Sequence, residues 1–346
     1  MNLRIVSFLS ACVLITGCER PPVDVIQRGY RGLAMEQMYD PRTLAKLEAA
    51  NAVPVATPEA DAGGPPAASV YHNIQVLNDL NVAQLARLMV AITAWVAPPG
   101  ESCAYCHSGA DMASDDNYRK IVARQMLRMV QHLNMDWKSH VGATGVTCYS
   151  CHRSNGVPTY VWYQPGPQQP SGFAAVHPEK NAPSPLVGLT ALPNEAFREF
   201  LDSQPANVRV VSTAALPGAD QESSIKQAEQ TYGLMMHMSE ALGVNCTFCH
   251  NTRSFTSWDS STPQRATAWY GIRMVRDVNT HFLEPLAATF PANRKGPLGD
   301  VAKVDCETCH QGVYKPLFGV SMLKDYPELA RPMTAAPTPA AAPAAQ

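Results

Sequence analysis

The chain has 346 residues, of which 46% are hydrophobic and 16% charged, and its formal net charge is -2. This apolar content excludes wholesale disorder, and the slight acidity argues against a nucleic-acid partner. No run of about eighteen apolar residues occurs, so no internal transmembrane helix is expected. The 10 Cys, 10 His and 14 Met residues carry the functional argument.

Residues 1–17 resemble a bacterial lipoprotein signal peptide. Arg4 gives a positive start, an apolar stretch follows, and the sequence LITGC that ends at Cys18 resembles a lipobox. We expect Cys18 to be the acylated first residue of the mature chain, anchored at the periplasmic face of the bacterial inner membrane. The alternative is an ordinary signal peptide in which Cys18 has no role.

Composition and periodicity divide the rest of the chain. We expect an extended Pro/Ala-rich segment (18–70), a first half (71–156), a connecting segment (157–220), a second half (221–331) and a disordered tail (332–346). The two halves look like an internal repeat, because the segments LRMV and IRMV recur at equivalent places.

Apolar residues at helical spacing predict four longer helices. They span 82–96, 115–133 with Ser114 as N-cap, 224–241 ending at Gly243, and Thr262-Pro263 to about Phe282. A short strand at Val208 to Val211 is a weaker expectation. The predicted fold is mainly α with much irregular loop and few short strands, and it is built from the two pseudo-repeated halves.

The cysteines of the mature chain other than Cys18 all belong to four C-x-x-C-H motifs. The motifs are Cys103-Ala-Tyr-Cys106-His107, Cys148-Tyr-Ser-Cys151-His152, Cys246-Thr-Phe-Cys249-His250 and Cys306-Glu-Thr-Cys309-His310. Two thiols at this spacing can bond the two vinyl groups of one haem, and the following His can bind the iron. The sequence therefore predicts four covalent haem c groups, and the expected fold is a mainly α multihaem cytochrome c built from two pseudo-repeated two-haem halves.

Disulfides, zinc sites and thioredoxin-like motifs explain the pattern less well. Disulfides do not account for a His after each pair, and zinc needs four ligands. Thioredoxin-like redox motifs belong to a βαβ pattern that this sequence lacks.

The second axial ligand decides between an electron carrier and a catalyst with an open iron. Position in the repeat favours Met89, Met126 and Met235 for the first three haems. The same alignment sets Met126 opposite Gly271, so the fourth haem lacks an equivalent Met, and His140 is the best unassigned His. The alternative places His140 on the second haem and Met274 on the fourth.

Three functions remain open on the residues alone. One is a membrane-anchored electron carrier that serves a larger complex. A multihaem redox enzyme would need an open iron, and a lipid-tethered shuttle would act without a complex.

The chain resembles the four-haem cytochrome subunits of purple-bacterial photosynthetic reaction centres. The resemblance runs from Arg31-Gly-Leu-Ala-Met to Leu323-Lys-Asp-Tyr-Pro-Glu-Leu. It includes segments outside the haem motifs, such as Ala91-Ile-Thr-Ala-Trp-Val and Gln311-Gly-Val-Tyr-Lys-Pro-Leu-Phe-Gly.

The resemblance implies the axial pairs His107/Met89, His152/Met126, His250/Met235 and His310/His140. It implies an electron carrier, not an enzyme, that binds the reaction-centre L and M subunits and re-reduces the photo-oxidised bacteriochlorophyll special pair. Its electrons would come from a soluble periplasmic donor, a small cytochrome c or a high-potential iron–sulfur protein.

Overall fold

The computed structural model describes residues 23–27, 36–109, 111–165, 184–193, 196–202, 207–210 and 224–331. Short and long helices joined by irregular loops make up most of these ranges, and their one sheet is a two-stranded hairpin. The expectation of a mainly helical chain with much loop and few strands is confirmed. The signal peptide, Cys18 and the tail from residue 332 lie outside the described residues.

Two short strands come first along the chain, and helices follow them to its end. The strands are β1 (Asp24–Gln27) and β2 (Glu36–Tyr39), and the α-helices are α2 (Pro41–Ala50), α3 (Ala67–Val70), α4 (Val82–Val96), α5 (Tyr118–Asp136), α6 (Lys138–Val141), α7 (Cys148–His152), α8 (Ala196–Leu201), α9 (Ile225–Leu242), α10 (Pro263–Val278) and α11 (Cys306–His310). Short 3-10 turns lie at Cys103–Tyr105, Pro185–Val187, Cys246–Phe248, Glu284–Ala288, Ala292–Arg294, Pro316–Gly319, Leu323–Asp325 and Pro327–Ala330, and a π-helical turn at Asn279–Leu283 follows α10.

The predicted helix ends are mostly right, because they rest on local capping chemistry. Asn81 and Gln84 form a reciprocal capping box at the start of α4. Gly243 ends α9 in the left-handed conformation, at φ 61°, and its Cα lies against the Gly312 carbonyl, where a side chain would collide. The prediction for α5 was wrong at its start, since Asn117 rather than Ser114 is the N-cap.

The extended segment before residue 70 holds more structure than its composition indicates. The β1–β2 hairpin and α2 both lie in it. The expected strand at Val208 is not formed in the described residues 207–210, and Val211 lies outside them.

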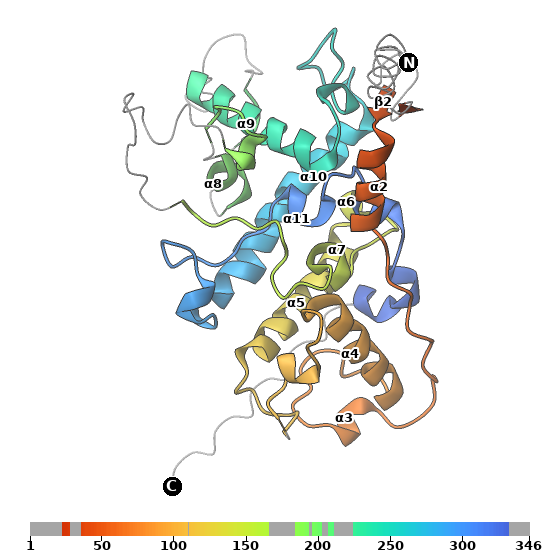
Figure 1. The fold of residues 1–346 in the computed structure, drawn as a ribbon. Helices are drawn as coiled ribbons and strands as arrows, with labels where there is room; N and C mark the ends of the chain where they lie inside the picture. The colour runs from red at the N-terminus through yellow and green to blue at the C-terminus, as the bar shows by residue number, and fades with distance from the viewer. Residues whose placement is uncertain are drawn as a thin grey trace, which may run out of the picture.

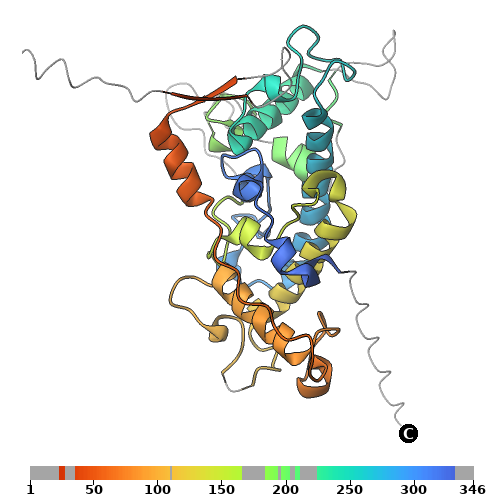
Figure 2. The ribbon, with the colours of Figure 1, turned by 90° about the vertical axis from the view of Figure 1, so that its right-hand side faces the viewer.

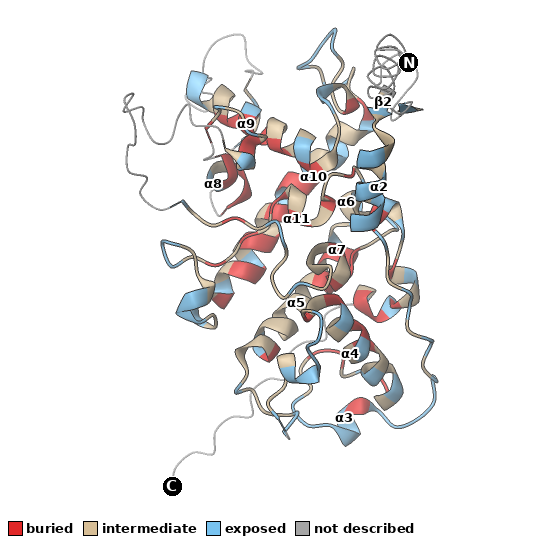
Figure 3. Cartoon of the chain, viewed as in Figure 1, coloured by how far each residue is buried: buried red, intermediate tan, exposed pale blue. Residues whose placement is uncertain are grey.

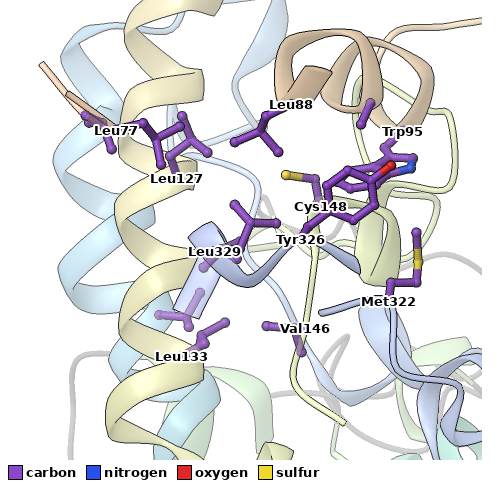
Figure 4. Close-up of a cluster of buried hydrophobic side chains, with 14 of the residues drawn as sticks. Leu77, Leu88, Trp95, Leu127, Leu133, Val146, Cys148, Met322, Tyr326 and Leu329 are labelled. Carbon is purple, nitrogen blue, oxygen red and sulfur yellow. The ribbon is translucent and has the colours of Figure 1, made fainter. Parts of the chain in front are cut away.

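The main core joins α4 and α5 to the end of the chain. Figure 4 shows Trp95 of α4 beside Tyr326, Leu127 of α5 beside Leu77, and Leu88 of α4 between these two groups. The Trp95 and Tyr326 rings meet edge to face, with centroids 4.6 Å apart. Each such buried side chain stabilises the fold by about 1.5–3 kcal/mol, so the end of the described chain is a structural part of the first half.

A second core lies between α8, α9 and α10. Phe197 and Phe200 of α8 pack with Leu234 of α9 and Val275 of α10. Trp162 joins this cluster, because its backbone pairs with that of Lys303 through two hydrogen bonds of 2.9 Å. Figure 3 shows the buried residues where these helices face one another.

The molecule is elongated, with the short helices α7 and α11 in its middle. Figures 1 and 2 show α3 and α4 at one end, and α8 and α9 at the other. Within the described ranges, no helix combines the length and apolarity that crossing a bilayer requires.

Candidate functional site: four haem-binding motifs

The four motifs adopt two local geometries that alternate along the chain. The first and third form 3-10 turns, Cys103–Tyr105 and Cys246–Phe248, capped by the side chains of Ser102 and Asn245. The second and fourth form the short helices α7 and α11. This alternation is the pattern expected of two repeated halves.

The second and fourth motifs share their caps as well. Thr147 with Ser150, and Asp305 with Thr308, form capping boxes at the starts of α7 and α11. Arg153 and Gln311 then end the two helices in the left-handed conformation, at φ 46° and 48°. Both turns therefore hold the motif cysteines and histidine on one rigid helical turn.

Every motif histidine donates its Nδ1–H to a backbone carbonyl nearby. In the first and third motifs the acceptor lies five residues on, and in the second and fourth three residues on. The bonds are His107 to Met112 (3.1 Å), His250 to Phe255 (2.9 Å), His152 to Asn155 (2.9 Å) and His310 to Val313 (3.0 Å). This bond fixes the tautomer with a bare Nε2, the form that binds a metal ion.

Two cations clamp the loops that orient the first and third histidines. The Lys120 ammonium donates to the carbonyls of Met112, Ala113 and Ser114, at 2.7–2.9 Å. The Arg265 guanidinium donates to the carbonyl of Ser257 at 2.8 Å. Lys120 and Arg265 are each the third residue of their helix, α5 and α10. Neither role was predicted from the sequence. The repeat alignment does place Lys120 and Arg265 at equivalent positions, and this could have pointed to a shared role.

Burial keeps several of these histidines uncharged. It lowers the pKa of His152 and His250, and it lowers the pKa of His310 to about 4. A neutral imidazole is the form that a metal requires.

His140 lies against α10 at the one place where that helix has no side chain. Its Nδ1–H donates to the Thr267 carbonyl at 2.9 Å. A Cβ on Gly271 would lie 2.6 Å from the His140 Cε1 atom. The predicted loop around His140 is in fact the short helix α6.

His140 also faces His310 of the fourth motif. Their ring centroids are 6.1 Å apart. Two imidazoles on opposite sides of one metal ion, with bonds of about 2 Å each, have centroids roughly 6 Å apart. The pair therefore fits two axial ligands of one haem iron.

The three candidate methionines lie on the predicted helices and are half-buried. Met89 of α4 and Met126 of α5 pack against the main core, and Met235 of α9 packs against the second core. Met126 and Gly271 are each the ninth residue of their helix, so the repeat alignment holds in three dimensions. Met274 contacts both cores, as a packing residue does.

Burial disfavours the thiolate form of four motif cysteines. Burial raises the pKa of Cys148 to about 12 and that of Cys249 to about 11, and it also raises the pKa of Cys106 and Cys306. The thiolate is the reactive form of cysteine, so burial lowers the reactivity of these four thiols at neutral pH.

The second and fourth motifs are in direct contact. The sulfur atoms of Cys151 and Cys309 lie within reach of a disulfide bond, with Cα atoms 4.5 Å apart, and Arg153 donates to the Cys309 carbonyl at 3.2 Å. A sulfur bonded to the other cysteine cannot also bond a haem vinyl group. The disulfide and the predicted thioether bonds are therefore alternative covalent states of these two residues.

Helix contacts give the order of the motifs along the molecule. α4, which precedes the first motif, packs on α7, and α7 packs on α11. α11 packs on α9, which leads into the third motif. The order in space is therefore first, second, fourth, third, along the long axis in Figure 1.

A sequence model of the photosynthetic reaction centre cytochrome C subunit matches residues 19–330. The chain belongs to this family. It is an electron-transfer cytochrome that donates to the special pair, and it is an electron carrier rather than an enzyme. It holds covalently bound haem c and associates with the reaction centre in the photosynthetic membrane. The predicted family and function are thus confirmed. The two alternative functions, a multihaem redox enzyme and a lipid-tethered shuttle without a complex, are not supported.

Individual relatives agree along most of the chain. The photosynthetic reaction center cytochrome c subunit of Rubrivivax gelatinosus is 54% identical over 335 residues, which cover 96% of this chain and 89% of that protein. The subunit of Thermochromatium tepidum is 51% identical over 92% of this chain and 78% of its own length. That of Roseobacter denitrificans is 41% identical over 76% of this chain and 73% of its own length.

Proposed function

We propose that this cytochrome subunit binds four haem c groups, one at each C-x-x-C-H motif. The thioether cysteines are Cys103, Cys106, Cys148, Cys151, Cys246, Cys249, Cys306 and Cys309. The observation that carries the proposal is the shared histidine geometry, in which a carbonyl holds each Nδ1–H and leaves Nε2 bare. When bound, haem c supplies a one-electron Fe(III)/Fe(II) couple.

We propose the axial pairs His107/Met89, His152/Met126, His250/Met235 and His310/His140. The contact between His140 and His310 supports the last pair. It favours this assignment over the alternative with His140 at the second haem and Met274 at the fourth. Methionine raises a haem potential and a second histidine lowers it, so we expect one low-potential centre among three higher ones.

The chain's own residues prepare the sites for electron transfer with little rearrangement. The carbonyl bonds fix the histidine rings, and the half-buried methionine side chains are held in packed cores. Because both axial groups come from rigid helices or helical turns, the coordination changes little between redox states. The two halves (71–156 and 221–331) each supply two sites, and residues 157–220 connect them.

We further propose that Cys18 is acylated and anchors the subunit at the periplasmic face of the inner membrane. There it contacts the L and M subunits and receives electrons from a small soluble cytochrome c or a high-potential iron–sulfur protein. The lipobox-like sequence before Cys18 supports the anchor.

The test is a redox titration of the purified reaction-centre complex, resolved by haem, on the native protein and on His140→Met. The native protein should show one centre well below the other three, and the variant should raise that centre alone. His281→Met is the matched control and should leave all four potentials unchanged. A shift at a high-potential centre in His140→Met would instead support the alternative in which His140 serves the second haem.

The mass of the intact protein tests the covalent state. Addition of a thiol to a vinyl group loses no atoms, so eight thioethers give the mass of the reduced polypeptide plus four haems, whereas a disulfide between Cys151 and Cys309 would leave the protein two hydrogen atoms lighter. A disulfide between Cys151 and Cys309 in the purified protein would contradict the proposal.

A further inference from the structure

A polar cluster lies where α5, α6 and α10 meet, outside the four motifs. We call it the Asp277 cluster, and its members are His132, Asp136, Trp137, Asp277 and His281. The Asp277 Oδ2 atom accepts two hydrogen bonds, from His132 Nε2 at 2.6 Å and from Trp137 Nε1 at 2.7 Å. One carboxylate oxygen of α10 thus holds two residues from the end of α5.

The remaining bonds complete the cluster. His281 Nδ1 donates to the other Asp277 oxygen at 2.6 Å, and His132 Nδ1 lies 2.7 Å from an Asp136 carboxylate oxygen. Burial raises the pKa of Asp277, but the N–H groups of His132, Trp137 and His281 outweigh it and keep the pKa below its usual value. Asp277 is therefore an anionic acceptor, and bonds to an ionised group are stronger than neutral ones.

Trp137 connects this carboxylate to the position of His140. It is the N-cap of α6, and its carbonyl accepts the backbone N–H groups of His140 at 2.9 Å and Val141 at 3.0 Å. A helix of four residues has little stability of its own, so its placement depends on contacts at its ends. The indole bond to Asp277 is such a contact.

Helix α10 supplies the groups that Trp137 and His140 contact. Asp277 and Gly271 lie six residues apart on this helix, about 9 Å along its axis. α10 therefore holds α6 at two places, through Asp277 at Trp137 and through the Thr267 carbonyl at His140. The segment from Trp137 to His140 is thus bonded to α10 at both ends.

We propose that Asp277 is a positioning residue for the His140 ligand. Through Trp137 and His132 it fixes the start of α6 on α10, so that the His140 imidazole stays opposite His310. The proposal rests on the proposed His310/His140 pair, and it adds a residue that contacts neither haem ligand in the described bonds. Loss of a group bonded directly to a ligand weakens metal binding about 10–100-fold, and we expect the lower end of this range because Asp277 acts through Trp137.

The experiment compares Asp277→Asn and Trp137→Phe with the native complex. Carbon monoxide competes with His140 for the reduced fourth haem, so we expect its binding there to be roughly tenfold faster in both variants. The electron paramagnetic resonance signal of the oxidised bis-histidine haem should broaden or shift. The three His/Met haems in the same samples should be unchanged, which separates this effect from general unfolding.

His281→Ala is the matched control. His281 bonds the same carboxylate but follows it in the same chain segment, so its loss leaves the link from α10 to α6 intact. Native behaviour of both Asp277→Asn and Trp137→Phe would overturn the positioning role. A native protein without any bis-histidine signal would instead overturn the ligand pair itself, so the two failures are distinguishable.

Discussion

At the residue scale, the sequence identifies the motif histidines as candidate ligands more sharply than the methionines. The C-x-x-C-H spacing identifies each motif histidine, and the structure adds that a carbonyl three or five residues on fixes its tautomer. Methionine is flexible and apolar, so it fits a core as readily as an iron site. Met274 and Met126 differ by their place in the repeat rather than by their chemistry.

The role of Gly271 leads to a prediction about steric fit. Gly271→Ala should improve helix propensity by about 1 kcal/mol, but its Cβ would lie 2.6 Å from the His140 ring. Crowding of this kind costs about 1–3 kcal/mol, so we expect a lower melting temperature and an altered spectrum of the fourth haem.

The control for Gly271→Ala removes the ring that the new methyl group would meet. In a His140→Ala background, Gly271→Ala should leave the melting temperature unchanged or raise it, because the new Cβ no longer meets an imidazole ring. Equal effects in both backgrounds would show that His140 does not lie on Gly271.

At the element scale, capping residues predicted most helix ends, and competition among them explains the failure at α5. Four residues that favour N-caps stand in a row from Ser114 to Asn117. The Ser114 hydroxyl accepts the Asp116 N–H, and Asp115 is bonded to Arg124, so Asn117 is left to cap Arg119. Such a choice depends on long-range partners that a local pattern does not contain.

Asp115 gives a prediction about acid stability. Hydrogen bonding to Arg124 lowers its pKa from 3.8 to about 2, with help from Asn73 and Lys120 against the opposing effect of burial. A folded pKa below the unfolded one stabilises the protein above pH 3.8, and this stabilisation is lost as the pH falls through about 2.

We therefore expect Asp115→Asn to lower the stability by about 1 kcal/mol at neutral pH, a value reduced for the partial exposure of the side chain. Melting temperatures from neutral to acid pH measure the effect, and the gap to the native protein should close on acidification. Asp116→Asn, at the exposed neighbouring acid, should show no such gap. A gap that widens in acid would contradict the sign of this argument.

At the scale of the whole molecule, the sequence predicts four sites but not their order in space. The two halves meet where the second motif of the chain contacts the fourth, and Arg153 donates to the Cys309 carbonyl there. Because the fourth motif lies next to the second, the third motif lies at one end of the row. The β1–β2 hairpin was likewise unpredictable, because its strands are short and one anchor is the distant bond from Gln37 to the Gly243 carbonyl. Both features arise from contacts between residues far apart in sequence.

Net charge gives a prediction about the soluble donor. Cleavage before Cys18 would remove Arg4 and no acidic residue, which takes the formal charge from -2 to -3. Each ferric haem with two ionised propionates adds about -1, so the four proposed haems would bring the oxidised mature subunit to roughly -7. This negative charge attracts a donor that has a basic surface. The range of the attraction is set by the Debye length, which falls from about 30 Å at 0.01 M salt to about 8 Å at 0.15 M.

We expect the rate of donor oxidation after a flash to fall roughly tenfold between about 0.01 and 0.15 M salt. Flash-induced absorbance changes of the donor, recorded with the purified complex across this range, measure the slope. A neutral small-molecule reductant is the control and should show almost none, because it has no charge to steer. A rate that rises with salt would mean that the donor meets a local positive surface, whatever the sign of the total charge.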